Sequence, residues 1–176
     1  MLPLDMMQMT LPGAPGIYYG DEAGLCGFTD PDNRRTYPWG REDKKMIAFH
    51  KDMIRIHKSC PEIKYGSVKE LLADNNFIAY GRFNRTAATV VVLNNNDFEV
   101  TREIEVWTLG IPKDAKLNLL MMTDNVSFHT EGSSVRVKNG VLTITLSRKS
   151  AAVFRYDSFE PVSDEEFWAD NYFEFD

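Results

Sequence analysis

The residues best suited to chemistry lie in a polar loop that follows a short apolar run. Ile17-Tyr18-Tyr19 stands between glycines and leads to two acids, Asp21 and Glu22, and then to Asp30-Pro31-Asp32-Asn33-Arg34. Two adjacent carboxylates suggest acid–base catalysis, but neighbouring residues of a strand point to opposite faces. We therefore expect Asp21 and Glu22 to have structural roles, such as pairing with an arginine of the loop.

Asp30 and Arg34 place a carboxylate and a guanidinium four residues apart. On residue types alone, the favoured interpretation is that Asp30 caps a turn at Pro31 and Arg34 pairs with it. The loop that carries them, residues 20–40, contains four glycines and two prolines. A loop of this length is rarely an idle connection, so we expect it to face a ligand.

The elements on either side of this loop must position it. Residues 1–8 are typical of the end of a helix, and the prolines and glycines of residues 10–16 stop that helix. The apolar run at residues 17–19 predicts a short buried strand whose C-terminal end opens into the loop. Substrates of parallel α/β barrels are bound by loops at such strand ends.

A helix is predicted over residues 42–59, after the loop. Met46, Phe49, Met53 and Ile56 recur with helical spacing and form one apolar stripe. Asp43 is the expected N-cap, and Pro61 is expected to close the helix. His50 and His57 lie near one face of this helix. We favour positions beside the core stripe over a metal pair, because no third ligand is near.

After Pro61 the pattern becomes that of β-structure. Asn139-Gly140 predicts a tight hairpin. Short strands with turns every 8–14 residues predict an antiparallel β-sandwich. The candidate strands are residues 68–72, 77–83, 89–93, 100–106, 116–122, 134–137, 141–146 and 151–156.

The formal net charge of −6 argues against nucleic acid and anionic membranes as partners. Eight acidic residues and no Lys or Arg lie between Asp157 and Asp176, so the rest of the chain carries +2. This tail also holds Phe167, Trp168 and three further aromatic residues after them, which are too many to leave in water. We predict a short helix from Asp164 and docking of the tail on the chain's own body, with a protein partner as the alternative.

Compartment and cofactors follow from what the sequence contains. Cys26 and Cys60 are the only cysteines, and their sparse number favours a reducing, cytoplasmic compartment. No apolar run approaches the roughly 20 residues that span a bilayer. We expect no cofactor and no metal site.

The stretch Pro12-Gly13-Ala14-Pro15-Gly16-Ile17-Tyr18-Tyr19-Gly20-Asp21-Glu22-Ala23-Gly24, followed by Asp30-Pro31-Asp32-Asn33-Arg34, closely resembles the last barrel strand of the α-amylase family of glycoside hydrolases. It is most similar to the neopullulanase, cyclomaltodextrinase and maltogenic amylase group. The resemblance implies that residues 1–61 form the end of a (β/α)8 catalytic barrel, namely its last strand, substrate loop and last helix. Residues 62–157 would be the C-terminal antiparallel β-sandwich, and residues 158–176 an acidic aromatic tail. The expected fold class is therefore mainly β.

The family cleaves α-glucosidic bonds with retention of configuration, using a carboxylate nucleophile and a protonated Glu. The motifs that carry these groups precede the matched stretch in the family and do not occur here. We assign no catalytic residue and expect the chain to be inactive on its own. The resemblance implies that Asp30 and Arg34 bind a glucose unit of an α-glucan beside the cleaved bond. Tyr19 and Trp39 are weaker candidates, since a core or rim position suits each of them equally.

A second hypothesis is a non-catalytic β-sandwich module that binds carbohydrate or protein. A flat row of exposed aromatic residues on the sandwich would favour this alternative. The barrel-facing surface of residues 17–19 and of the helix is expected to lack its usual neighbours. We therefore expect either self-association through this surface or packing of the segment against the sandwich in a way that differs from a barrel.

Overall fold

The structure is a computed structural model, and it describes residues 2–124, 126–130, 132 and 134–159. Three α-helices precede the strands: α1 (Leu2–Thr10), α2 (Lys44–Ser59) and α3 (Pro61–Tyr65). Short 3-10 helices are η1 (Asp21–Ala23), η2 (Asp32–Arg34) and η3 (Val106–Leu109). The strands are β1 (Ser67–Asp74), β2 (Phe77–Phe83), β3 (Ala88–Asn94), β4 (Val100–Glu105), β5 (Ala115–Thr123), β6 (Phe128–His129), β7 (Val135–Lys138), β8 (Val141–Leu146) and β9 (Ser150–Tyr156). Among the described residues, no helix has the length and apolar character needed to cross a bilayer.

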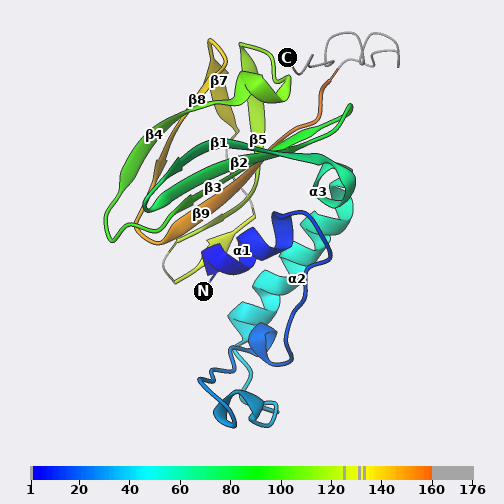
Figure 1. The fold of residues 1–176 in the computed structure, drawn as a ribbon, viewed down its shortest axis with the longest axis vertical. Helices are drawn as coiled ribbons and strands as arrows, with labels where there is room; N and C mark the ends of the chain where they lie inside the picture. The colour runs from blue at the N-terminus through cyan, green and yellow to red at the C-terminus, as the bar shows by residue number, and fades with distance from the viewer. Residues whose placement is uncertain (1, 125, 131, 133, 160–176) are drawn as a thin grey trace, which may run out of the picture.

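The strands form one antiparallel sheet with the order β1-β2-β3-β9-β5-β7-β8-β4, and β6 pairs with β5. The sheet curls until β4 lies near β1, which gives a nearly closed, barrel-like body (Figure 1). The predicted antiparallel β-architecture is confirmed, and all eight predicted strands are present. The two layers of the predicted sandwich are nevertheless one continuous sheet. Residues 115–117 of β5 pair with β7, whereas residues 118–123 pair with β9, so this long strand joins both layers.

The hairpin between β7 and β8 confirms the turn prediction. Lys138 pairs with Val141, so the loop consists of Asn139 and Gly140 alone. Both residues have positive φ, 52° and 82°, as a two-residue turn of this type requires.

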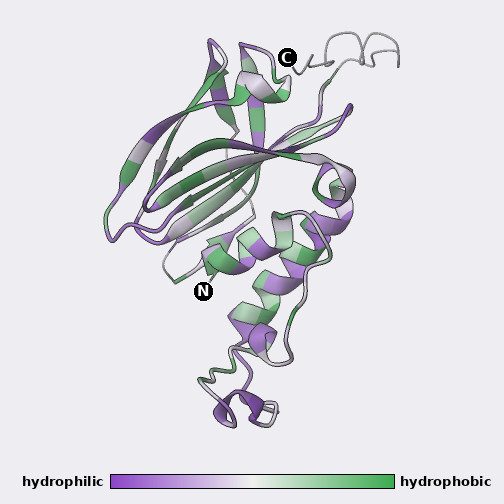
Figure 2. Cartoon of the chain, viewed as in Figure 1, coloured by the Kyte–Doolittle hydropathy of each residue, from purple (hydrophilic) through white to green (hydrophobic). Residues whose placement is uncertain are grey.

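The interior of the curled sheet is one apolar core, and the sheet's outer face carries a second. On β3, Val90 and Val92 point into the interior, whereas Val91 and Leu93 point outward to the helices. Every residue of β3 is buried because both faces are covered. Figure 2 shows hydrophobic residues gathered along the strands and hydrophilic residues around η2, at the far end of the loop.

Helix α2 has the predicted stripe. It begins at Lys44, two residues after the predicted start, and ends at Ser59 as predicted. Met46, Phe49, Met53 and Ile56 are all buried, at 0 to 8% exposure. The Asp43 side chain caps the helix by accepting hydrogen bonds from two backbone N–H groups of its first turn. Pro61 comes two residues after Ser59, the last residue of α2, and starts α3, which was not predicted. Proline at a first helical position is favourable, because its missing N–H would be unpaired there in any case.

The predicted strand at residues 17–19 is wrong for this chain: these residues have no regular secondary structure. Ile17, Tyr18 and Tyr19 are 36, 52 and 43% exposed. A strand is held by hydrogen bonds to neighbouring strands, and no strand of the described residues pairs with this segment. The predicted division into residues 1–61, 62–157 and 158–176 stays a prediction, and the predicted tail helix lies outside the described residues.

Candidate functional site

The polar loop lies beyond the N-terminal end of α2, away from the sheet (Figure 1). Two contacts tie it to the helix. The backbone N–H of Asp43, the α2 cap, donates to the carbonyl of Ala23 over 2.9 Å. Gly24, with φ of 74°, lies so close to Asp43 that a Cβ there would stand 3.0 Å from the Asp43 Cβ. The helix cap therefore also fixes the start of the loop.

Asp30 and Arg34 are brought together, as predicted. The Arg34 Nε lies 3.4 Å from the Asp30 Oδ1, and the two side chains are 62 and 68% exposed. Such an exposed pair contributes little to folding, typically about 0–1 kcal/mol. Because both side chains are largely exposed, they are available to a polar ligand.

A second pair in the loop was not singled out from the sequence. Arg35 donates from Nε to Asp32 Oδ1 over 2.8 Å, and Tyr19 donates its hydroxyl proton to the Arg35 carbonyl over 2.9 Å. The spacing of three residues between Asp32 and Arg35 was visible in the sequence, but nothing there distinguished it from the neighbouring pair. Partial removal of water and the adjacent Tyr18 raise the pKa of the Tyr19 hydroxyl.

A hollow of about 380 Å³ lies beside these pairs. Its lining combines aromatic rings with polar groups: Tyr18, Tyr19, Asp21, Leu25, Cys26, Gly27, Asp32 and Asn33. Asp30 and Arg34 do not line the hollow but flank Asp32 and Asn33 in the chain. Rings combined with carboxylate and amide groups suit a ligand with both apolar faces and hydroxyls, such as a sugar.

Trp39 is not part of this hollow. Its ring lies 4.5 Å from that of Tyr37 and is 80% exposed. Glu22 has a structural role of a different kind from the predicted arginine pair, because its Oε2 accepts from the Gly20 backbone N–H over 2.9 Å. Glu42 likewise accepts from the Gly40 N–H, and this hydrogen bond lowers the pKa of the Glu42 carboxyl.

The side chains of the two histidines of α2 contact backbone carbonyl groups. Nδ1 of His50 lies 2.9 Å from the Met46 carbonyl, and Nδ1 of His57 lies 2.8 Å from the Met9 carbonyl. In the described part of the chain, no group of three or more His, Cys, Asp and Glu side chains is arranged to hold a metal.

Comparison with known proteins identifies the family. Residues 71–157 match the family described as "Alpha amylase, C-terminal all-beta domain". The amylopullulanase of Thermoanaerobacter thermohydrosulfuricus is 32% identical over 164 residues, which cover 87% of this chain and 10% of that protein. Neopullulanase 2 of Thermoactinomyces vulgaris is 34% identical over 145 residues, or 80% of this chain and 23% of that protein.

Solved structures agree. An Anoxybacillus α-amylase has a TM-score of 0.75 at 25% identity. The match covers 92% of this chain and 33% of the chain of that enzyme. The native form of the Nostoc punctiforme debranching enzyme has a TM-score of 0.70 at 28% identity, and the match covers 87% of this chain and 30% of the chain of that enzyme. Residues 71–157 therefore form the C-terminal all-β domain of the α-amylase family. The chain spans 8 to 12% of the first three curated relatives.

Proposed function

We propose that this chain is the C-terminal portion of a retaining α-glucan hydrolase of the neopullulanase and cyclomaltodextrinase type. Its loop contributes part of a glucose-binding subsite, and its β-domain stabilises the catalytic barrel. The proposal is supported by relatives named amylopullulanase, neopullulanase and cyclomaltodextrinase. The structure of one α-amylase with this fold, from Geobacillus thermoleovorans, is described as complexed with acarbose.

The exposed Asp30–Arg34 pair is the observation that carries the subsite. A carboxylate accepts hydrogen bonds from two vicinal hydroxyls, while a neighbouring guanidinium donates to sugar oxygens and orients the carboxylate. The pair meets this need because its members touch only weakly, at 3.4 Å, and remain open to solvent. The hollow beside Tyr18 and Tyr19 would accept the apolar face of the glucose ring.

The barrel assignment of residues 1–61 belongs to the same proposal. In a complete barrel, the seven other strands would supply the neighbours that residues 17–19 lack here, and the segment would then become a strand. The nucleophile and the acid would come from those earlier strands. We therefore propose that the present chain has no hydrolytic activity of its own. A cytoplasmic location is also proposed, in keeping with the two free cysteines, Cys26 and Cys60.

The test uses Asp30→Ala and Arg34→Ala in the enzyme with its barrel complete. Loss of a hydrogen bond to a charged group costs about 1.5–3 kcal/mol, which lowers kcat/KM on maltodextrin about ten- to a hundredfold. The melting temperature should hardly change. The matched control is Asp52→Ala and Arg55→Ala, an exposed pair on α2 at 3.0 Å, which should alter neither quantity. Loss of stability with normal kinetics would overturn the subsite assignment.

The alternative, a non-catalytic binding module, gains no specific support from the sheet. Its exposed aromatic residues include Phe98 and Trp107, at 64 and 52% exposure. They lie beyond opposite ends of β4, Phe98 before Val100 and Trp107 after Glu105. They therefore do not form the flat row that would bind a glucan chain.

A further inference from the structure

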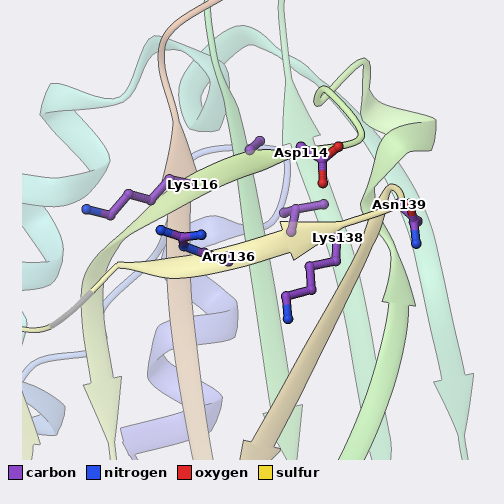
Figure 3. Close-up of a pocket in the computed structure, with 7 residues that line it drawn as sticks. Asp114, Lys116, Arg136, Lys138 and Asn139 are labelled. Carbon is purple, nitrogen blue, oxygen red and sulfur yellow. The ribbon is translucent and has the colours of Figure 1, made fainter.

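The outer face of the sheet carries a groove that is lined by three basic side chains and one acidic side chain. We call this surface the basic groove, after its three cations Lys116, Arg136 and Lys138. They line a hollow of about 480 Å³ together with Asp114, Ala115, Val137 and Asn139. Figure 3 shows Lys116 and Arg136 extending side by side from adjacent strands, with Lys138 further along the strand of Arg136.

The lining of this hollow carries more positive than negative charge, because it contains three cations and one acid. Lys116 and Arg136 face each other directly across β5 and β7, and like charges at such positions repel. None of the three cations makes a hydrogen bond or ion pair with any described residue. Asp114 is the only acid in the lining, and Glu103 lines an adjoining hollow with Arg136 and Lys138. An anionic occupant would relieve this repulsion.

The described chain ends beside the basic groove. Asn118 pairs with Arg155 across β5 and β9, and β9 ends at Tyr156, so the described chain leaves β9 beside the first half of β5. The Phe159 ring packs edge-on against Tyr156, with 5.0 Å between the ring centroids. The same ring lies 3.5 Å from the Cβ position of Gly110. This contact fixes the exit of the tail next to the segment that leads into β5.

The sequence after Phe159 contains the negative charges and aromatic rings that would complement the basic groove. Residues 160–176 contain seven acidic residues, five aromatic residues and no Lys or Arg. An extended segment of this length spans up to about 55 Å. The start of β5 is only five residues beyond Gly110, where Phe159 is anchored. The groove is therefore well within reach.

We propose that the acidic aromatic segment of residues 160–176 docks on the basic groove of its own chain. Its carboxylates bind between Lys116 and Arg136, and its aromatic rings pack on the aliphatic stems of these cations. Tethering favours this intramolecular contact, because a short linker gives an effective concentration in the millimolar range.

The test measures how fast chymotrypsin cleaves after Phe167 and Trp168 in the full chain. Lys116→Glu with Arg136→Glu should speed this cleavage about fivefold or more, and 0.5 M NaCl should do the same to the wild type, because salt screens surface charges. The matched control is Lys45→Glu with Lys51→Glu on α2, which changes the net charge equally and should leave cleavage unchanged. Thermal melting verifies that each variant is folded.

A charge swap makes the test specific. Glu165→Lys with Glu166→Lys should restore slow cleavage in the Lys116→Glu, Arg136→Glu background and speed it in the wild type. Equal cleavage rates in the wild type and the groove variant would overturn the proposal. Sedimentation gives a second criterion: a dimer that the groove variant converts to a monomer would place the tail on another copy and also overturn it.

Discussion

Arg155 of β9 donates a hydrogen bond from Nε to Oε1 of Glu62 in α3 over 2.7 Å, and the Glu62 side chain is completely buried. Thr89 of β3 donates to the same oxygen over 2.7 Å. Helix α3, which follows α2, is thus joined to the middle of the sheet by charge-assisted hydrogen bonds. These bonds fix the direction in which α2 leaves the sheet and so the position of the loop.

We predict that Glu62→Ala lowers the free energy of unfolding by about 3 kcal/mol, because it leaves a partly buried guanidinium and a buried hydroxyl without their acceptor. Urea denaturation measures the loss. The control is Asp52→Ala, which breaks an exposed ion pair and should cost less than about 1 kcal/mol. Similar costs for the two variants would contradict the role given to Glu62.

Tyr80 gives the fold a dependence on alkaline pH. Its hydroxyl lies 2.6 Å from Oγ1 of Thr10, and Thr10 donates to the Met6 carbonyl. Burial raises the pKa of Tyr80 from 10.0 to about 12, although Thr10 and Arg82 act in the opposite direction. The folded state therefore holds its proton more tightly than the unfolded state. This contribution to stability is complete below pH 10 and is lost as pH rises to about 12.

Tyr80→Phe should remove that part of the pH dependence. Urea denaturation at pH 9 and at pH 11 should show a smaller fall in stability for the variant than for the wild type. Absorbance at 295 nm offers an independent measurement, because one tyrosine of the folded wild type should ionise late and be missing from the variant. Identical titration curves would contradict the prediction.

Local patterns predicted much of this fold. The turn formers between short apolar runs located the strands, and Asn139-Gly140 fixed the hairpin between β7 and β8. The stripe from Met46 to Ile56 and the Asp43 cap fixed α2. These features depend on residues close together in sequence, so a single sequence contains them.

Features that depend on distant residues were not predicted. Ile17 to Tyr19 has the composition of a strand, but a strand also needs partners that composition does not report. The Glu62–Arg155 bond joins residues 93 positions apart. The basic groove depends on the register that places Lys116 opposite Arg136. At the candidate site, Asp30 and Arg34 were singled out because the stretch that contains them resembles the α-amylase family, whereas the hollow beside Tyr18 required coordinates.

Met53 connects the loop-bearing helix to the sheet. It is completely buried in the apolar cluster between α2 and the outer face of the sheet. Met53→Ala should lower the free energy of unfolding by about 3 kcal/mol, from lost burial and the cavity left behind. Helix ellipticity and the fluorescence of Trp107, measured with Trp39 and Trp168 replaced by Phe, should report one shared transition if helix and sheet unfold together. Lys51→Ala, on the exposed face of α2, should change stability by less than about 0.5 kcal/mol.

The last prediction concerns association of the chain. Phe28 and Trp39 are 85 and 80% exposed, and the segment from Ile17 to Tyr19 is also open. Burying such apolar surface yields about 25 cal/mol per Å², so we propose that two copies meet through this loop. Sedimentation at rising concentration should show self-association that Phe28→Ser with Trp39→Ser weakens about tenfold or more, which corresponds to about 1.4 kcal/mol. Phe98→Ser with Trp107→Ser, which removes exposed rings from the sheet, should leave association unchanged. A wild-type chain that stays monomeric throughout would show that the loop surface is stable in water and would contradict the prediction.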